Sequence, residues 1–454
     1  MEQQNENIIA AIDVGTTKIA VLVGRKDSDG HIEVLGYGRN ESKGVRRGAV
    51  LNIEDAIKSI GNAVAQAEAT SGIKITEAYV GIAGHHIRSQ QFTQTKNRNS
   101  ANDAISRDDI DYLIDQMREM PTEMGEEVLH ILPQSYTVDG EHEIMSPVGM
   151  YGKQLSGVFH IIFGNTAAAN NLRQCVERNG IKVKGLILEP LASSAAVLTD
   201  DDKELGVALV DIGGGTTDVA IYKNGCISHS KVIPFGGNSV TEDIRRGCNI
   251  LERQAEGLKV QHGSALATKD LENQFVAIPG HNGLKDKRIS LAMLANIINA
   301  RMSEIITIVK HEIESTSDLK SLGAGIVITG GGSMLPNLIH LFAMHTGCEV
   351  RIGTPDKVII KCEFENVTNL PSNSTSIGLL MMGFENLQNG TEPELHIDKE
   401  TGEEKNEFDL ETENNDDMEN TPKKGKVFQK LSNVWNGAIN GAINWATEVE
   451  DKQL

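Results

Sequence analysis

The chain has 454 residues, of which 39% are hydrophobic and 4% aromatic, and its formal net charge is −20. This length allows two or more domains with a large buried core, and the acidic balance argues against general nucleic-acid binding, which usually requires a basic face. The five cysteines show neither paired nor metal-ligand spacing, which predicts reduced thiols in a cytosolic protein. The polar first residues predict no secretory signal, and no uninterrupted apolar run reaches the length of a membrane span.

In chain order, the first predicted elements surround an Asp–Gly turn. An apolar strand from Ile9 leads into Asp13-Val14-Gly15-Thr16-Thr17-Lys18, and strands at 19–23 and 32–37 and a helix at 53–69 follow. Glycine lets main-chain N–H groups point at an anion and lets a bulky phosphate come close. The aspartate could hold a metal ion through water, and the threonine hydroxyls could donate to phosphate oxygens.

The same order of elements recurs in the second half of the chain. A second apolar strand leads into Asp211-Ile212-Gly213-Gly214-Gly215-Thr216-Thr217, and strands at 219–222 and 227–233 and a helix from Ser239 follow. Internal duplication is a strong indicator of architecture. It predicts two similar α/β lobes with a cleft between them, in which the two turns grip a nucleotide from both sides.

Two segments interrupt these repeats. The first contains a charged helix at 106–120, with Ser106 as its N-cap, and strand-like segments at 128–138 and 158–163. We interpret it as a small α+β domain inserted in the first lobe. The second interruption is predicted to be helical and then rich in loops.

A third glycine cluster, Gly330-Gly331-Gly332-Ser333-Met334, lies between an apolar strand and a helix expected at Pro336. Ordered structure is expected to end near Phe384. The predicted organisation is then a first lobe at 1–83 and 165–203 with its inserted domain at 84–164, a second lobe beginning at 204–246 with an insertion at 247–288, and a stretch at 289–386 that completes the second lobe and returns to the first.

The remaining chain is predicted to be an acidic linker at 387–422 and an amphipathic helix at 423–454. Between Glu392 and Glu419 there are 13 acidic residues and only two lysines, which favours disorder. Behind this linker, apolar and aromatic side chains recur at helical spacing near several lysines, a pattern that favours an interfacial membrane helix. Docking on the protein's own core or on a partner is the alternative. The membrane-facing candidates are Phe428, Leu431, Val434, Trp435, Ile439 and Trp445.

Other nucleotide and metal motifs are absent from the sequence. There is no P-loop, and no G-x-G-x-x-G follows a strand. His85 and His86 have no further metal ligands nearby, and His311-Glu312 is not followed by a second histidine at zincin spacing. We therefore interpret these histidines as structural or surface residues.

Together, the three glycine-rich signatures resemble the phosphate-1, phosphate-2 and adenosine motifs of the actin, heat-shock chaperone and sugar-kinase ATPase superfamily. Within it, residues 8–384 and the tail resemble the FtsA family of bacterial cell-division proteins. The resemblance implies an α/β, duplicated actin-like (ribonuclease H-like) two-lobed ATPase fold with an inserted small α+β domain and a C-terminal amphipathic helix. The stretches most similar to that family are Ala78–Gly84, Leu191–Ser194, Lys231–Pro234 and Gly325–Gly332.

The resemblance also implies ATP and Mg²⁺ as ligands, with roles for individual residues. Gly15, Thr16 and Thr17 would cradle the outer phosphates, Lys18 would pair with one, and Gly213 to Thr217 would close the other side. Asp13 and Asp211 would hold Mg²⁺ through water, and Gly330 to Met334 would lie against the adenosine. Glu256 and Lys259 would reach the ribose and base, although this spacing is also typical of a solvated helix face. Glu189 would position an attacking water or, alternatively, only cap the helix at Pro190.

The implied function is that of a cell-division protein with at most slow ATPase activity. It would link the tubulin-like polymer FtsZ to the cytoplasmic face of the inner membrane at the division site, polymerise with itself and recruit later division proteins. FtsA-like proteins are thought to bind the C-terminal tail of FtsZ on the second insertion, where Lys287, Arg288 and Arg301 are the basic candidates. A solvated charged loop is the alternative there.

Three other kinds of protein in the superfamily are alternatives to this function. A small-molecule kinase would need a polar pocket deep in the cleft and would have no use for a membrane helix. A pilus-type assembly ATPase shares the lobes and the inserted domain but lacks the C-terminal helix. A chaperone ATPase would need a substrate-binding β-domain, for which no room is left after Phe384.

Overall fold

The computed structural model describes residues 8–389, apart from 28–30, 281–284, 318, 356–358, 363 and 365–366. These residues belong to one compact unit. The predicted linker beyond 389 lies outside the described residues. So do the candidate membrane residues Phe428, Leu431, Val434, Trp435, Ile439 and Trp445.

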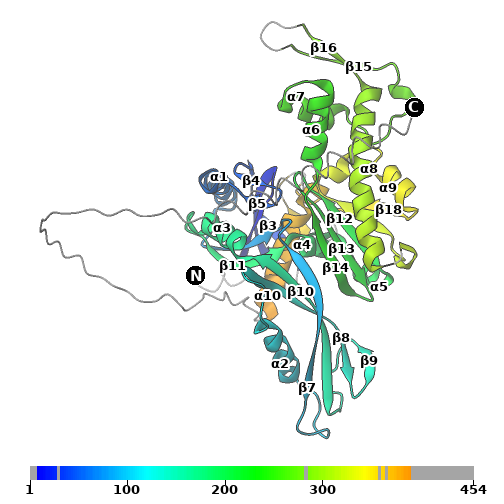
Figure 1. The fold of residues 1–454 in the computed structure, drawn as a ribbon. Coiled ribbons are helices and arrows are strands. Elements are labelled where there is room, and N and C mark those ends of the chain that lie inside the picture. Colours follow the sequence, from blue (N-terminus) through cyan, green and yellow to red (C-terminus); the bar gives the residue numbers. More distant parts are fainter. Residues whose placement is uncertain are drawn as a thin grey trace, which may run out of the picture. The chain divides into compact units, whose positions relative to one another are not determined.

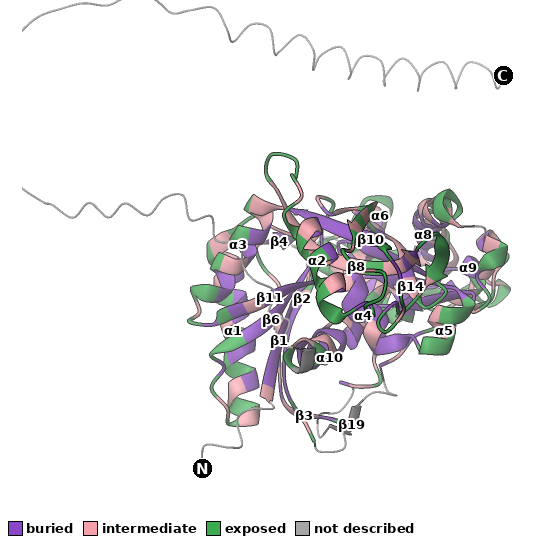
Figure 2. Cartoon of the chain, turned by 90° about the horizontal axis from the view of Figure 1, so that it is seen from below, coloured by how far each residue is buried: buried purple, intermediate pink, exposed green. Residues whose placement is uncertain are grey.

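The first lobe is built on a six-stranded mixed sheet with the strand order β11-β6-β1-β2-β3-β19. The first three strands form an antiparallel meander, and β6 runs parallel to β1. Helices α1 and α3 pack against one face and α10 against the other (Figure 2), so the central strands are apolar throughout. The elements are β1 (Ile8–Val14), β2 (Lys18–Lys26), β3 (Ile32–Glu41), β6 (Glu77–Ile82), β11 (Lys182–Leu188), β19 (Ile359–Cys362), α1 (Ile53–Ser71), α3 (Thr166–Glu177) and α10 (Ser374–Asn389).

The second lobe repeats this plan (Figure 1). Its five-stranded sheet has the order β14-β13-β12-β17-β18, again a meander of three strands followed by two strands parallel to the first. The repeated order confirms the duplication that the two Asp–Gly turns predict. The elements are β12 (Val207–Ile212), β13 (Thr217–Lys223), β14 (Cys226–Ile233), β17 (Ile326–Thr329), β18 (Val350–Ile352), α6 (Gly237–Cys248), α8 (Leu291–Thr316) and α9 (Leu338–Thr346).

Helix α8 is the one helix in the described part of the chain that is long and apolar enough, by length and composition, to cross a membrane. A core helix of a globular protein passes the same test. Ile298, Ile305 and Val309 on this helix are buried in the second-lobe core, and Arg301 and Glu304 interrupt its apolar run. We therefore assign α8 to the core of the second lobe.

The inserted segment folds on its own four-stranded sheet, in the order β7-β10-β8-β9, with helix α2 packed against it. Ser106 caps α2 as predicted, and Asp109 completes the capping box. Leu113, Phe159 and Phe163 lie in a separate small core. The elements are β7 (Arg88–Asn97), α2 (Arg107–Arg118), β8 (Glu126–Val138), β9 (Glu141–Ile144) and β10 (Gln154–Asn165).

The inserted domain also contacts the second lobe, at its edge strand β14. From β7, the Ser89 hydroxyl donates to the carbonyl of Ser230 over 3.1 Å. From β8, the Gln134 side-chain amide donates to the carbonyl of Ile227 over 2.5 Å. His160, which is buried, lies 3.4 Å from the Ser230 hydroxyl. The inserted domain therefore joins the first lobe, from which it emerges, to the second.

The remaining elements are short, and some differ from the predictions. The second insertion contains a two-stranded hairpin, β15 with β16, in the part predicted to be loops. Helix α9 begins two residues after the predicted Pro336, because Asn337 with φ 66° is its N-cap. All five cysteines are free, as predicted. These elements are β4 (Val45–Arg46), β5 (Ala49–Val50), α4 (Glu189–Val197), α5 (Asp200–Leu205), α7 (Glu252–His262), β15 (Phe275–Ile278) and β16 (Lys287–Ser290).

Candidate functional site

The two Asp–Gly turns meet face to face between the lobes. A Cβ added to Gly214 would lie 1.9 Å from Oγ1 of Thr17, and one added to Gly215 would lie 2.3 Å from Oγ1 of Thr16. Both distances are far below van der Waals contact, so only glycine allows this approach. The duplicated hairpins thus bring the predicted phosphate-binding residues of both lobes to one place.

The third glycine cluster packs against the second turn. Gly330 has φ 80°, and a Cβ there would lie 2.2 Å from Oδ1 of Asp211. The Ser333 hydroxyl donates to the carbonyl of Gly330 over 2.8 Å, while Met334 is half exposed. All three glycine-rich signatures of the sequence therefore converge on Asp211.

The two aspartates of the turns are buried and carry perturbed pKa values. Burial raises the pKa of Asp13 to about 6, against the lowering effect of Lys18 and with a further rise from Asp211. Burial also raises the pKa of Asp211, although two hydroxyls that donate to its Oδ2 oppose the shift. These donors are Ser193 at 2.5 Å and Thr375 at 3.2 Å.

Two more acidic side chains complete the cluster. Asp218, which follows the second turn directly, is buried, and its Oδ1 has no hydrogen-bond partner in the described part of the chain. Burial and the charge of Asp211 raise its pKa well above the usual range. The pKa of Glu189 is also raised, by burial and then by Asp13, Asp218 and Asp211. Glu189 was predicted from the sequence and Asp218 was missed, although Asp218 directly follows the second turn in the run Gly215-Thr216-Thr217-Asp218.

Lys18 is the cation of this cluster. Its Nζ donates to the carbonyl of Ser372 over 2.5 Å and to Oδ1 of Asn373 over 2.6 Å, just before α10. Burial lowers its pKa, and Asp13 opposes that shift. The sequence gives no local signal for Ser372 or Asn373, because they lie more than 350 positions from Lys18.

The donor set fits a hydrated divalent cation. Among the described residues, no three His, Cys, Asp or Glu side chains are arranged to hold a metal ion directly. The resemblance to the superfamily implies that Asp13 and Asp211 act through water, which Mg²⁺ retains readily. The partnerless oxygen of Asp218 and the crowding of carboxylates around one lysine are what such an ion would relieve.

Comparison with known proteins gives two matching family models. One, described as Cell division protein FtsA, matches residues 208–378, and the other, described as SHS2 domain inserted in FTSA, matches residues 84–163. The protein named Cell division protein FtsA in Pseudomonas aeruginosa is 36% identical over 393 residues, which cover 85% of this chain and 92% of that protein. The chain belongs to the FtsA family of cell-division proteins. The relative of the same name in Escherichia coli K12 is 33% identical and is covered to the same extent.

Solved structures share the fold of this FtsA-family chain. The PilM–PilN type IV pilus biogenesis complex has a TM-score of 0.60 at 13% identity, covering 83% of this chain and 98% of the other. MreB 5 of Spiroplasma citri bound to AMPPNP has a TM-score of 0.50 at 17% identity, covering 85% and 99%. The actin-like two-lobed fold with an inserted domain is therefore confirmed.

Beside the second turn, Lys259 and Glu256 of α7 reach the start of α6. Lys259 Nζ donates to the carbonyl of Gly237 over 3.0 Å and pairs with Glu256 at 2.7 Å. The N–H of Gly237 in turn donates to the carbonyl of Gly213. The Thr217 hydroxyl, predicted to face phosphate, donates to the carbonyl of Phe235 over 2.9 Å.

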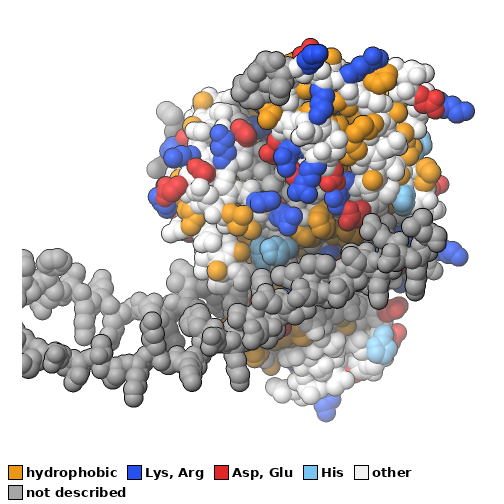
Figure 3. Space-filling model, turned by 45° about the horizontal axis from the view of Figure 1, so that its top comes forward, with side chains coloured by type: hydrophobic (Ala, Val, Ile, Leu, Met, Phe, Trp, Pro, Cys, Tyr) orange, Lys and Arg blue, Asp and Glu red, His pale blue; other side chains and the backbone are white. Residues whose placement is uncertain are grey.

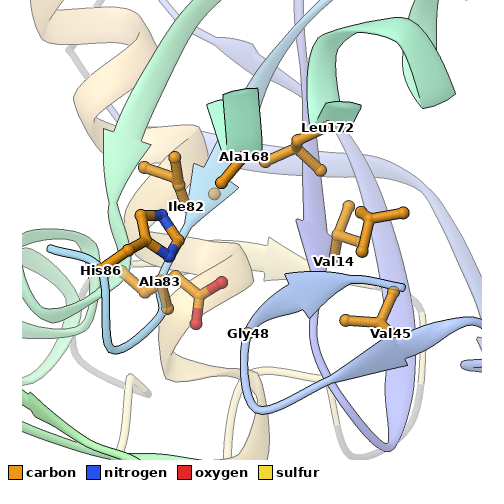
Figure 4. A pocket seen from close by; sticks show the side chains of 11 residues that line it. Val14, Val45, Gly48, Ile82, Ala83, His86, Ala168 and Leu172 are labelled. Atoms are coloured by element: carbon orange, nitrogen blue, oxygen red, sulfur yellow. The ribbon is translucent and has the colours of Figure 1, made fainter. Parts of the chain in front are cut away.

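A small enclosed pocket lies behind the first turn, with a volume of about 10 Å³. Figure 4 shows His86, Ile82 and Ala83 on one side of it and Val14 and Val45 on the other. Glu189 also lines it. This volume is at the lower limit of the space that can hold one water molecule.

The candidate partner residues of the second insertion differ in their surroundings. The Arg288 guanidinium stacks over the Phe275 ring at 3.9 Å, and Lys287 donates to the carbonyl of Asn249. Arg301 already pairs with Asp243 at 2.5 Å and with Glu304. Figure 3 shows Lys and Arg side chains gathered over the middle of one face, despite the net charge of −20.

Proposed function

We propose that this FtsA-family protein binds ATP with Mg²⁺ between its two Asp–Gly turns. The observation that carries the proposal is the close approach of Gly214 and Gly215 to Thr17 and Thr16, which places the glycine main chain of the second turn beside the hydroxyls of the first. An actin-like neighbour, MreB 5, has AMPPNP bound. Membership of the FtsA family supports the proposal further, because it places this fold in a cell-division protein.

Each residue has a separate task in this proposal. Gly15, Thr16 and Thr17 cradle the outer phosphates from the first lobe, and Gly213, Gly214, Gly215 and Thr216 do so from the second. The hydroxyl of Thr217 would have to leave the carbonyl of Phe235 to join them. Asp13 and Asp211 hold the hydrated Mg²⁺, which supplies positive charge to the phosphate oxygens. Gly330, Gly331, Gly332, Ser333 and Met334 lie along the adenosine, and Glu256 and Lys259 lie near the ribose and base.

Lys18 changes partners in this scheme. In this structure its Nζ donates to the carbonyl of Ser372 and to Oδ1 of Asn373, which lie just before α10. An incoming phosphate offers a stronger, charged acceptor. The exchange would release the start of α10 from the first lobe, so that ATP acts as a conformational and polymerisation switch by favouring one arrangement of the lobes.

Glu189 is proposed to orient the water that attacks the terminal phosphate. It lies at the start of α4 beside Asp13 and Asp218, whose charges act on its carboxyl. Replacing Glu189 by Ala should leave the dissociation constant for ATP within about twofold and lower turnover by roughly 100-fold, the scale of general-base catalysis. The comparison needs ATP titration and phosphate release on the same preparation. Turnover equal to wild type would remove Glu189 from the mechanism.

The division role is proposed at the level of the whole chain. The protein would tether FtsZ to the cytoplasmic face of the inner membrane at the division site through its C-terminal tail. It would also self-polymerise and recruit later division proteins. The C-terminal tail of FtsZ would bind beside Arg288 and Lys287, with Arg301 holding α8 and α6 together beneath it through Asp243.

A small-molecule kinase of the same superfamily, or a pilus-type assembly ATPase, is the alternative. Family membership favours the division role over both alternatives.

A further inference from the structure

The turn that carries Glu189 is contacted by the inserted domain. Strand β11 is an edge strand of the first-lobe sheet, and the inserted strand β8 packs against it. His130 of β8 accepts a hydrogen bond at its Nε2 from the backbone N–H of Leu188, over 3.0 Å. Leu188 is the N-cap residue of α4 and immediately precedes Glu189, and no side chain of its own caps that helix.

The hydrogen bond fixes the state of the His130 ring. Because Nε2 accepts, a neutral ring must carry its proton on Nδ1. Burial lowers the pKa of His130 to about 4, which keeps the ring neutral near pH 7. The imidazole is therefore in the state that can hold the Leu188 N–H.

A second histidine of the inserted domain, His86, lines the same pocket as Glu189. His86 Nε2 is buried and has no partner among the described residues. It lines the pocket of about 10 Å³ together with Glu189 and Gly48 (Figure 4). That volume accommodates one water, which needs polar partners such as an imidazole nitrogen and a carboxyl group.

Gly48, in the wall of this pocket, is hydrogen-bonded to the first turn. The N–H of Gly48 donates to Oγ1 of Thr16 over 3.2 Å. A Cβ on Gly48 would lie 2.9 Å from the backbone of Ala83 and Gly84, where the inserted domain begins. The start of the inserted domain, the Thr16 turn and Glu189 thus surround one small space.

We propose that the inserted domain positions Glu189, with His130 holding the backbone before it and His86 holding its carboxyl through a water in the pocket. This inference rests on the proposed role of Glu189 in ATP turnover. Both histidines are positioning residues, because they act on Glu189 and not on the nucleotide. Movement of the inserted domain relative to the first lobe would then change the rate of hydrolysis.

The test compares steady-state ATP turnover of the full-length protein with that of four variants. His130→Leu removes the acceptor, and His130→Gln replaces it with an amide oxygen of similar reach. His86→Leu removes the pocket nitrogen. His142→Leu is the matched control, because His142 is exposed in the same domain and its ring contacts the Thr137 hydroxyl. Thermal melting of each variant checks folding.

We expect His130→Leu and His86→Leu to lower kcat by about tenfold with KM changed less than about twofold, since misplacing a catalytic group costs rate and not binding. His130→Gln should recover most of kcat, and His142→Leu should match wild type.

Three results would overturn the inference. One is kcat within twofold of wild type in both leucine variants, and another is a loss in His130→Gln as large as in His130→Leu. The third is a wild-type protein that binds ATP without turnover, which removes the role of Glu189 but leaves nucleotide binding intact. A wild-type protein that does not bind ATP would refute the proposed function itself and this inference with it.

Discussion

At the scale of residues, four buried carboxyl groups lie close together where a cation and a nucleotide are proposed to bind. The positive charge of the cation would offset the cost of ionising them. Asp13, Asp211, Asp218 and Glu189 all have raised pKa values, with burial as the largest cause in each case. Lys18 is the positive side chain that acts on Asp13. Such a cluster costs stability in the ligand-free protein, as functional sites often do.

Replacing Asp13 by Asn should therefore stabilise the ligand-free protein at high pH. The pKa of Asp13 is raised from 3.8 to about 6, so its contribution to stability is full below pH 4 and is lost as the pH rises through 6. Asn resembles the protonated acid, and we expect Asp13→Asn to gain about 1–3 kcal/mol at pH 8. Thermal unfolding without nucleotide at pH 8 and pH 4.5 measures this.

The gain should shrink towards pH 4.5, where Asp13 is largely protonated in the wild type. The same variant should bind Mg²⁺–ATP more weakly at pH 8. A ligand-free Asp13→Asn protein less stable than wild type at pH 8 would contradict this electrostatic interpretation.

At the scale of elements, two helices that carry site residues cross at a glycine. Gly378 of α10 faces α4, and a Cβ there would lie 1.7 Å from the carbonyl oxygen of Ala192. Helix α4 begins with Glu189, and α10 carries Thr375, which donates to Asp211. The crossing therefore sets how the two helices present these side chains.

Gly378→Ala should destabilise the protein by about 1–3 kcal/mol, because the added methyl group meets backbone and the helices must separate. Gly257→Ala is the matched control. Gly257 also lies inside a helix, α7, with no atom within 4 Å of an added Cβ, and alanine there should be neutral or gain up to about 1 kcal/mol. Denaturant unfolding of both variants tests the difference, and equal stabilities would show that α4 and α10 can part without cost.

Much of the fold was predictable from local pattern. The duplicated Asp–Gly turns, the Ser106 cap and the strand at 128–138 each have a signal within a few residues. Strand β7 was not predicted, because its half-exposed face consists largely of Ser, Gln and Thr, which show no apolar alternation. The β15–β16 hairpin was missed although Pro279-Gly280 and Asn282-Gly283 lie between its strands, because each strand is only four residues long and shows little apolar alternation.

The candidate site was predictable in its turns but not in its surroundings. Asp13, Asp211 and the glycines follow apolar strands directly, and topology then brings them together. The partners of Asp211 and Lys18 come from α4 and the start of α10, which are distant in sequence. His130 was missed because one histidine on a strand has no pattern, and its role depends on where β8 packs.

At the scale of the whole molecule, the inserted domain is connected to both lobes. It reaches Leu188 in the first lobe through His130 and the edge strand β14 of the second lobe through Ser89 and Gln134. A change in the angle between the lobes must alter at least one of these contacts. These contacts join the inserted domain to the residue before Glu189 and to the second lobe, as the proposed link between ATP binding and assembly would require.

The proposed tether function requires the C-terminal tail and the candidate FtsZ surface of the second insertion to act together. Helix α10 ends at Asn389, and Phe384 within it is buried in the first-lobe core. A chain ending at Asn389 therefore keeps the whole described fold and removes only the acidic segment and the candidate membrane residues. Arg288→Glu changes the candidate FtsZ surface and leaves the tail intact.

The most direct measurement is co-sedimentation of the protein and FtsZ with liposomes that contain anionic lipid, in the presence of ATP and Mg²⁺. We expect the full-length protein to carry FtsZ to the liposomes, the chain ending at Asn389 to leave both proteins in the supernatant, and Arg288→Glu to sediment without FtsZ. Sedimentation of FtsZ by the shortened chain as efficiently as by the full-length protein would contradict the proposed membrane tether.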